Sequence, residues 1–181
     1  MSTLQSIPLQ TIQGAPTCLG DFAGKVLLIV NVASKCGLTP QYEGLEKLYR
    51  THASKGLVVL GFPANNFLSQ EPGTNEEIAD FCKSSYDVSF PMFAKISVAG
   101  SDRHPLYDAL VSAAPTAHSP NGNAMRERLA SKNIPIHPEP EVLWNFEKFL
   151  VNRQGEVIGR FAPDTSPEDP DLLKAIDQAL S

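Results

Sequence analysis

The sequence predicts an α/β protein with a central mixed β-sheet, helices on its faces and a β-ribbon at the N-terminal end. Two nearly unbroken aliphatic runs, at residues 25–32 and 57–62, are typical of strands buried on both faces of a parallel sheet. A helical pattern lies between them, so the three segments predict a βαβ unit. Residues 149–151 and 157–161 flank a polar turn, which predicts an antiparallel hairpin and makes the sheet mixed.

Local signals place the elements of the first half of the chain. Residues 7–12 and 17–19 lie on either side of a break at Gly14 and Pro16, which predicts the ribbon. The helix of the βαβ unit follows Thr39-Pro40. Thr39 is its N-cap candidate, and proline suits the first helical position because the N–H group it lacks would have no partner there.

A second helix is predicted after the second strand. Thr74 and Glu77 have the spacing of a capping box, in which each side chain accepts the other residue's backbone N–H. Ile78, Phe81 and Cys82 give the helix that follows an apolar stripe. This stripe predicts that Cys82 lies on the buried side of the helix.

Two further helices are predicted toward the C-terminus. Residues 105–113 form a helical pattern, and Asp169-Pro170 caps and starts a last helix that continues to Leu180. Residues 114–140 differ, because they contain five prolines and show no steady period. We expect a long stretch without regular structure there, which is usually functional or mobile.

Composition narrows the class of protein. A length of 181 residues, 42% of them hydrophobic and 19% charged, predicts a soluble globular protein with one domain over residues 1–181. The net charge is −5 and no basic run occurs, so we expect neither nucleic acid nor anionic lipid as a partner. The longest apolar run is too short to span a bilayer, and residues 1–12 lack the pattern of a signal peptide. We therefore expect a cytoplasmic protein without stable membrane association.

Three cysteines are the first candidates for chemistry. Cys18, Cys36 and Cys82 form no CxxC pair, and their odd number favours free thiols in a reducing compartment. Cys36 stands between the first buried strand and its helix, where the partial positive charge of a helix N-terminus stabilises a thiolate. The alternative is a buried cysteine that acts as a small hydrophobic residue, and position alone leaves both open.

Four sequence blocks carry a family resemblance. Residues 31–42 (NVASKCGLTPQY), 61–67 (GFPANNF), 70–73 (QEPG) and 144–151 (WNFEKFLV) resemble, in the same order, the signature blocks of the glutathione peroxidase family. The resemblance implies a thioredoxin-like fold and the reduction of hydroperoxides at a cysteine or selenocysteine. Cys36 occupies that position, so the non-selenium, cysteine-containing variety is implied.

The resemblance also implies a catalytic tetrad of Cys36, Gln70, Trp144 and Asn145. Amide and indole N–H groups around the sulfur would favour the thiolate and the oxyanion that leaves the peroxide. Taken singly, each partner has a structural alternative: a core aromatic for Trp144, a surface loop residue for Gln70 and a turn former for Asn145.

The match has departures in the second block. Many relatives have Cys and Gln where this chain has Ala64 and Asn66. In thioredoxin-dependent relatives, however, a cysteine at the place of Cys82 resolves the oxidised catalytic cysteine, so this role is implied for Cys82. The alternative is apolar packing beside Ile78 in the helix. Cys18 lies outside all four blocks, and we interpret it as structural.

The function that these observations predict is a thiol peroxidase that acts on hydrogen peroxide and organic hydroperoxides. The cysteine would become a sulfenic acid, which thioredoxin or glutathione would then reduce. A dithiol oxidoreductase would need a second cysteine at position 39, where this chain has Thr39. An accessory or binding protein without peroxidase activity would be expected to have lost a tetrad member. The four histidines are scattered without ligand spacing, so we expect no metal and no cofactor.

Overall fold

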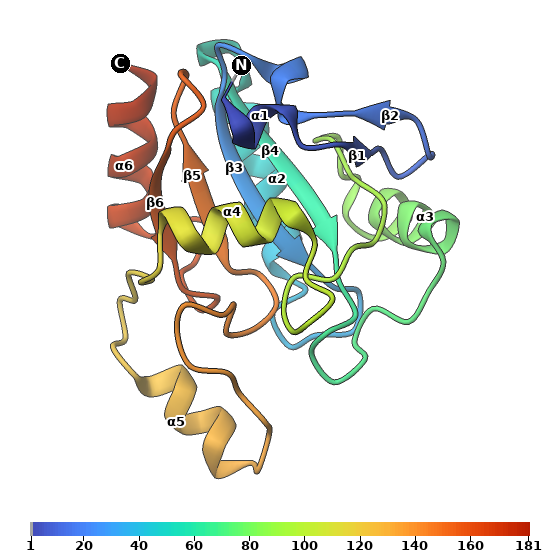
Figure 1. Cartoon of the computed structure of the whole chain (residues 1–181), viewed down its shortest axis with the longest axis vertical. Coiled ribbons are helices and arrows are strands. Elements are labelled where there is room, and N and C mark those ends of the chain that lie inside the picture. Colours follow the sequence, from blue (N-terminus) through green and yellow to red (C-terminus); the bar gives the residue numbers. More distant parts are fainter. Residues whose placement is uncertain (1) are drawn as a thin grey trace.

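A four-stranded mixed sheet with the strand order β4-β3-β5-β6 forms the centre of the molecule (Figure 1). The computed structural model describes residues 2–181. β3 is parallel to β4 and antiparallel to β5, and β5 is antiparallel to β6. The strands are β3 (Val26–Val32), β4 (Leu57–Pro63), β5 (Lys148–Val151) and β6 (Val157–Phe161). The predicted βαβ unit and the predicted hairpin are both confirmed.

β3 is the best buried strand of the sheet. All seven of its residues are buried, and it is hydrogen-bonded to a neighbouring strand on each side. Its nearly unbroken aliphatic sequence suits a strand that is covered on both faces. The C-terminal end of β3 leads directly into the loop that carries Cys36, so this loop starts from a fixed point.

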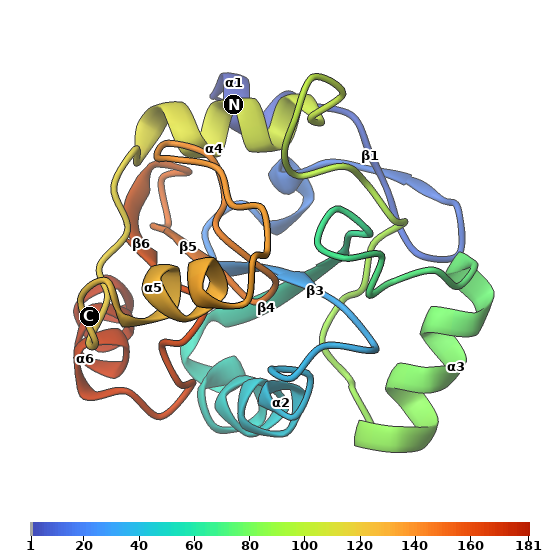
Figure 2. The same ribbon diagram turned by 90° about the horizontal axis from the view of Figure 1, so that it is seen from below.

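Helices cover both faces of the sheet. α2 (Gln41–His52) and α6 (Pro170–Leu180) lie on one face, and α4 (Pro105–Ala113) lies on the other (Figure 2). α3 (Asn75–Tyr86) lies at the periphery, beyond the β4 side of the sheet, and contacts α2. Asp169 accepts the N–H groups of Asp171 and Leu172 at the start of α6, as predicted.

The capping box of α3 is confirmed. Thr74 Oγ1 accepts the backbone N–H of Glu77 at 3.1 Å, and Glu77 Oε1 accepts that of Thr74 at 3.3 Å. Ile78 and Cys82 are buried, whereas Phe81 is half-buried and lines a cavity. Two residues of the predicted apolar stripe therefore lie in the core, and the third lines the cavity beside the helix.

The predicted cap of α2 is wrong. The helix begins at Gln41 with Pro40 as its N-cap residue, and no side chain caps it. Thr39 Oγ1 instead donates to the carbonyl of Ala33 at 2.8 Å and accepts the N–H of Cys36 at 3.0 Å. The tight turn at Cys36 brings these buried backbone groups to the Thr39 hydroxyl, which satisfies them both.

The N-terminal ribbon is confirmed but shorter than predicted. It consists of β1 (Leu9–Gln10) and β2 (Pro16–Thr17), which pair antiparallel after the short helix α1 (Thr3–Ser6). Thr11 forms an isolated bridge to Phe93, so the ribbon is attached to the loop that follows α3.

The segment 114–140 was expected to lack regular structure, which is wrong for its middle part. α5 (Ala124–Ser131) forms there and projects from the rest of the molecule (Figure 1). Arg160 fixes the two ends of the segment, because its guanidinium donates to the carbonyls of Ala114 and Pro140. It also pairs with the buried carboxylate of Glu147 at 2.7 Å.

Irregular segments contact both edge strands of the sheet. Gly61 of β4 forms a bridge with Met92, and Phe161 of β6 forms one with His118.

None of the helices formed by residues 2–181 is both long enough and apolar enough to cross a membrane.

Candidate functional site

Cys36 lies in the turn between β3 and α2. Its side chain is 8% exposed, and Sγ accepts the backbone N–H of Leu38 at 3.3 Å. Its own N–H donates to Thr39, as described above. The sulfur therefore accepts one backbone N–H on the N-terminal side of α2, where the helix dipole favours negative charge. This is the position that the sequence predicted.

Gln70 and Asn145 meet beside this turn. Asn145 Nδ2 donates to Gln70 Oε1 at 2.9 Å, and the backbone carbonyl of Gln70 accepts the N–H of Lys35 at 3.0 Å. These contacts join three loops that are far apart in sequence. Asn145 is fully buried, and its Oδ1 atom has no hydrogen-bond partner among residues 2–181. An unpaired buried acceptor costs free energy, so the stability of the fold does not explain this atom.

Trp144 is held from two directions. Its side chain is 6% exposed and packs on Phe67 with the ring centroids 5.3 Å apart. Its backbone carbonyl accepts Nδ2 of Asn31 at 3.1 Å, and Asn31 Oδ1 accepts the N–H of Glu147 at 3.1 Å. Asn31 thus positions the Trp144-Asn145 loop from the middle of the sheet. Sequence reasoning assigned it no role, although a lone polar residue in the aliphatic run of β3 was a visible signal.

Lys148 is a second supporting residue that sequence reasoning missed. Its side chain is fully buried, and Nζ donates to the carbonyls of Phe146 at 2.6 Å and Pro163 at 3.2 Å. Phe146 has a left-handed backbone with φ of 68°, which an L-residue adopts only when its surroundings hold it there. Burial lowers the pKa of Lys148 to about 7.

The structure contains no Cys36–Cys82 disulfide. All three cysteines are free thiols, and Cys82 is buried on α3. Burial raises the pKa of its thiol to about 11, so the thiol is protonated at neutral pH. Cys18 is half-buried in the turn after the ribbon, where its N–H donates to Asp21.

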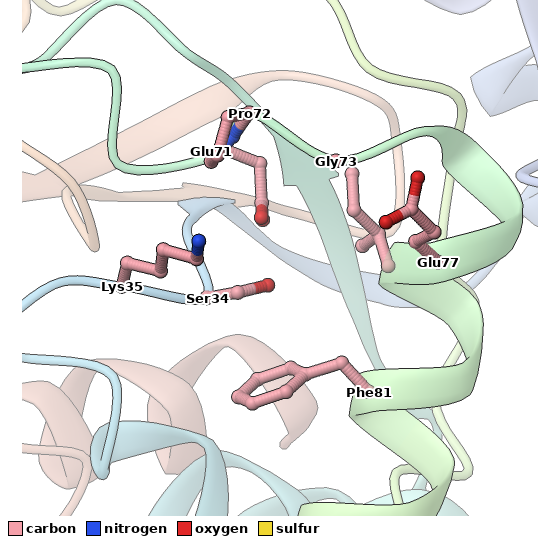
Figure 3. Close-up of a pocket in the computed structure, with 8 residues that line it drawn as sticks. Ser34, Lys35, Glu71, Pro72, Gly73, Glu77 and Phe81 are labelled. Carbon is pink, nitrogen blue, oxygen red and sulfur yellow. The ribbon is translucent and has the colours of Figure 1, made fainter.

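A cavity of about 420 Å³ separates the Cys36 loop from α3 (Figure 3). Ser34 and Lys35 line one side, Glu71 to Gly73 form its rim, and α3 closes the other side. Glu71 is 1% exposed, and burial raises the pKa of its carboxyl. The motif that contains Glu71 was visible in the sequence, but the burial of its carboxylate was not.

Residues 2–181 contain no group of three or more His, Cys, Asp or Glu side chains that could hold a metal ion.

Comparisons with known proteins agree on one family. A glutathione peroxidase family model matches residues 4–111. The thioredoxin/glutathione peroxidase BtuE of Escherichia coli (strain K12) is 54% identical over 174 residues, which are 96% of this chain and 94% of the relative. The glutathione peroxidase-like peroxiredoxin gpx1 of Schizosaccharomyces pombe (strain 972) is 44% identical over 168 residues, 93% and 94% of the two chains.

Solved structures share the fold. The crystal structure of Trgpx in apo form has a TM-score of 0.70 and 33% identity, and the match covers 99% of this chain and 97% of the other. A thioredoxin-family thiol:disulfide interchange protein from Chlorobium tepidum TLS has a TM-score of 0.62 at 15% identity, covering 97% and 93%. The predicted thioredoxin-like fold is confirmed.

Proposed function

This chain belongs to the glutathione peroxidase family, and we propose that Cys36 is the residue at which it reduces hydroperoxides. The protein is a thiol peroxidase. The observation that supports Cys36 as the reacting residue is the set of contacts in the turn that carries its sulfur. Sγ accepts the N–H of Leu38 in the turn that precedes α2, and the Gln70–Asn145 pair adjoins the same turn. We also propose that residues 1–181 act as one domain of this family.

The first half-reaction follows from this geometry. The Cys36 thiolate attacks the terminal oxygen of the hydroperoxide, the O–O bond breaks, and the cysteine becomes a sulfenic acid. The departing alkoxide or hydroxide takes up a proton and leaves as alcohol or water. The Leu38 N–H that the sulfur accepts stabilises negative charge on the thiolate before this step.

Gln70, Trp144 and Asn145 are proposed to complete the tetrad. Because Gln70 Oε1 accepts from Asn145, the amide group Nε2 of Gln70 is left to donate to another acceptor. The Trp144 indole adds a donor that does not titrate near neutrality. Donation from these groups to the Cys36 sulfur or to the departing oxygen is a prediction for the catalytic cycle.

Cys82 is proposed to resolve the sulfenic acid as an intramolecular disulfide. Such a bond needs Cα atoms within roughly 4.4–6.8 Å, so a Cys82 that is buried in α3 must be released by movement of that helix. The structure favours this movement because cavities of about 420 and 490 Å³ flank α3 on two sides. Cys82 itself lines the larger one.

A thiol reductant completes the cycle, and we propose that thioredoxin serves more efficiently than glutathione. An intramolecular disulfide is the form that a dithiol reductant reduces directly. The E. coli relative carries both reductants in its name, and the S. pombe relative is called a peroxiredoxin. We further propose a cytoplasmic location, where free thiols such as the three of this chain persist.

The direct test is a coupled assay of the purified chain with hydrogen peroxide and an organic hydroperoxide. Cys36→Ser should abolish turnover of both substrates, and Cys18→Ser should retain it as the matched control. Parallel assays with a thioredoxin system and with glutathione rank the reductants. Turnover that survives in Cys36→Ser would remove Cys36 from the centre of the reaction, and glutathione-only activity would overturn the proposed reductant.

A further inference from the structure

The turn formed by Leu68 and Ser69 is an unusual feature beside the proposed reaction site. Both residues have a left-handed backbone, with φ of 52° and 51°. The N–H of Gln70 donates to the carbonyl of Phe67 at 3.3 Å and closes the turn across them. These are the φ signs of a type I′ turn, whose two central positions are usually taken by Gly, Asn or Asp. The turn itself therefore does not explain a leucine at this position.

The positions of the strained residues point to the site. Among residues 2–181, the non-glycine residues with a positive φ are Leu68, Ser69, Asp87, Asn133 and Phe146. Asp87 and Asn133 are of types that adopt this backbone readily. The other three each lie within two residues of a proposed tetrad member, Gln70 or Asn145. Strain of this kind persists where the surroundings hold it, and it gathers at functional sites.

The turn is fixed to the rest of the molecule. Asn65 Oδ1 accepts the N–H of Glu71 at 2.9 Å, which ties together the residues on either side of the turn. Phe67, directly before Leu68, packs on the ring of Trp144. The backbone that carries Leu68 is therefore held in place beside two of the proposed tetrad residues.

The side chain of Leu68 is exposed although its neighbours are buried. It is 57% exposed, whereas Phe67 is 5% and Trp144 is 6% exposed. Ile158 of β6 is the other large hydrophobic side chain that is exposed among residues 2–181. A single exposed leucine is ordinary on a protein surface. Here the exposure coincides with a strained backbone, so neither packing nor turn preference accounts for this residue.

We propose that Leu68 is a specificity-determining residue that contacts the organic group of the hydroperoxide, an inference that rests on the proposed reaction at Cys36. The terminal oxygen of the substrate must reach the Cys36 sulfur, so its organic group extends over the surface around the sulfur. Gln70 links that surface to Leu68, because its backbone carbonyl accepts the N–H of Lys35, the residue before Cys36, at 3.0 Å. An apolar group that covers Leu68 removes both from water, which favours alkyl and aryl hydroperoxides over hydrogen peroxide.

The test uses unbranched alkyl hydroperoxides of increasing length, from ethyl to hexyl. They share one reacting group and carry no charge, so the Lys35 cation does not distinguish among them. Stopped-flow fluorescence of Trp144, the single tryptophan of the chain, gives the second-order rate constant of Cys36 oxidation. A fully buried methylene is worth about fourfold, so on a half-covered surface the rate constant should rise about twofold per methylene.

Leu68→Asn should flatten this series because it removes the apolar side chain. Asparagine suits a left-handed backbone, so the variant should unfold at the same or a higher urea concentration. Leu68→Met keeps an apolar side chain and should keep the rise with chain length. The matched control is Ile158→Thr, which removes the other exposed large hydrophobic side chain and should keep the rise as well. Each series is divided by its ethyl value, so a general change in Cys36 reactivity cancels.

Three outcomes would overturn the proposal. A natural-protein series that does not rise with chain length would exclude an apolar subsite, whether or not the variants fold. An equal rise in the natural protein and in Leu68→Asn would show that another surface contacts the organic group. An effect of Leu68→Asn that is confined to reduction by thioredoxin would assign Leu68 to docking of the reductant. Turnover that survives in Cys36→Ser would instead refute the proposed reaction site, and that assay is separate from the series.

Discussion

Thr39 and Cys36 are linked by a hydrogen bond from the Cys36 backbone N–H to Thr39 Oγ1, 3.0 Å long and buried. The same hydroxyl donates to Ala33, so one side chain closes the turn that presents the sulfur. Thr39→Val would leave both backbone groups buried and unpaired. We expect a loss of about 1–3 kcal/mol in the free energy of unfolding, and a slower reaction of Cys36 with peroxide. Urea denaturation and stopped-flow kinetics measure the two effects.

Thr39→Ser is the control for this prediction because it keeps the hydroxyl and loses only a methyl group. It should retain most of the stability and reactivity. Equal behaviour of the valine and serine variants would show that the hydroxyl does not organise the turn.

Gln70 and Asn145 should act as a coupled pair in peroxide reduction. Removal of either side chain with alanine breaks the hydrogen bond between them and leaves the partner unpaired. The double variant should therefore lose less than the sum of the two single losses, with a coupling energy of about 0.5–3 kcal/mol. The measured quantity is the second-order rate constant of sulfenic acid formation in all four proteins. Strict additivity would mean that the two amides work independently.

Stability should depend on pH through Lys148. Its pKa is about 7 in the folded protein because of burial, and it is close to 10.4 in an unfolded chain. Between these values the unfolded state binds one more proton, so this residue makes the free energy of unfolding rise with pH, by up to about 1.4 kcal/mol per unit. Below pH 7 Lys148 is protonated in both the folded and the unfolded state, so its contribution to the free energy of unfolding is lost.

Lys148→Met should remove that slope between pH 7 and 9, whereas Lys174→Met, at an exposed position, should keep it. Urea titrations at several pH values give the comparison. A Lys148→Met curve parallel to that of the natural protein would mean that the amine stays charged when buried.

Cys82 should be the slowest cysteine to alkylate in the reduced protein. It is buried and its pKa is raised to about 11, whereas Cys18 is partly exposed. Ile78→Ala removes a buried side chain one turn before Cys82, so it should loosen α3 and accelerate alkylation of Cys82 several-fold. Peptide mapping after timed iodoacetamide treatment measures the rates. Asp80→Ala, on the exposed side of α3, should change nothing, and an equal acceleration there would argue against local opening.

The sequence predicted those parts of the molecule whose causes are local. The aliphatic runs of β3 and β4 identify buried strands, and the Thr74–Glu77 spacing identifies the start of α3, because each signal lies within a few residues. Thr39 has the local features of a cap, but a buried turn offers its hydroxyl different partners. α5 escaped prediction because its sequence has little amphipathic period.

The sequence predicted which residues belong to the candidate site, but not the contacts that hold them in place. The place of Cys36 before a helix left its role open, and the resemblance of the four sequence blocks made it the candidate. The Asn145–Gln70 bond joins residues 75 positions apart, which no local pattern encodes. Asn31 and Lys148 support the Trp144-Asn145 loop through burial, which depends on the completed fold. Glu71 stands in the QEPG motif, but the burial of its carboxyl depends on contacts that form only in the completed fold.

The bridges at the two sheet edges affect how copies of this protein can meet. An unpaired edge strand is a template on which another chain can add a strand and begin aggregation. Here Gly61 of β4 exchanges backbone hydrogen bonds with the segment at Met92, and His118 bonds to the backbone of residues 160 and 162 at the β6 edge. Each edge is thus interrupted by the chain itself, and a continuous intermolecular sheet is disfavoured. Association between copies is then favoured through side chains, whose specificity single substitutions can alter.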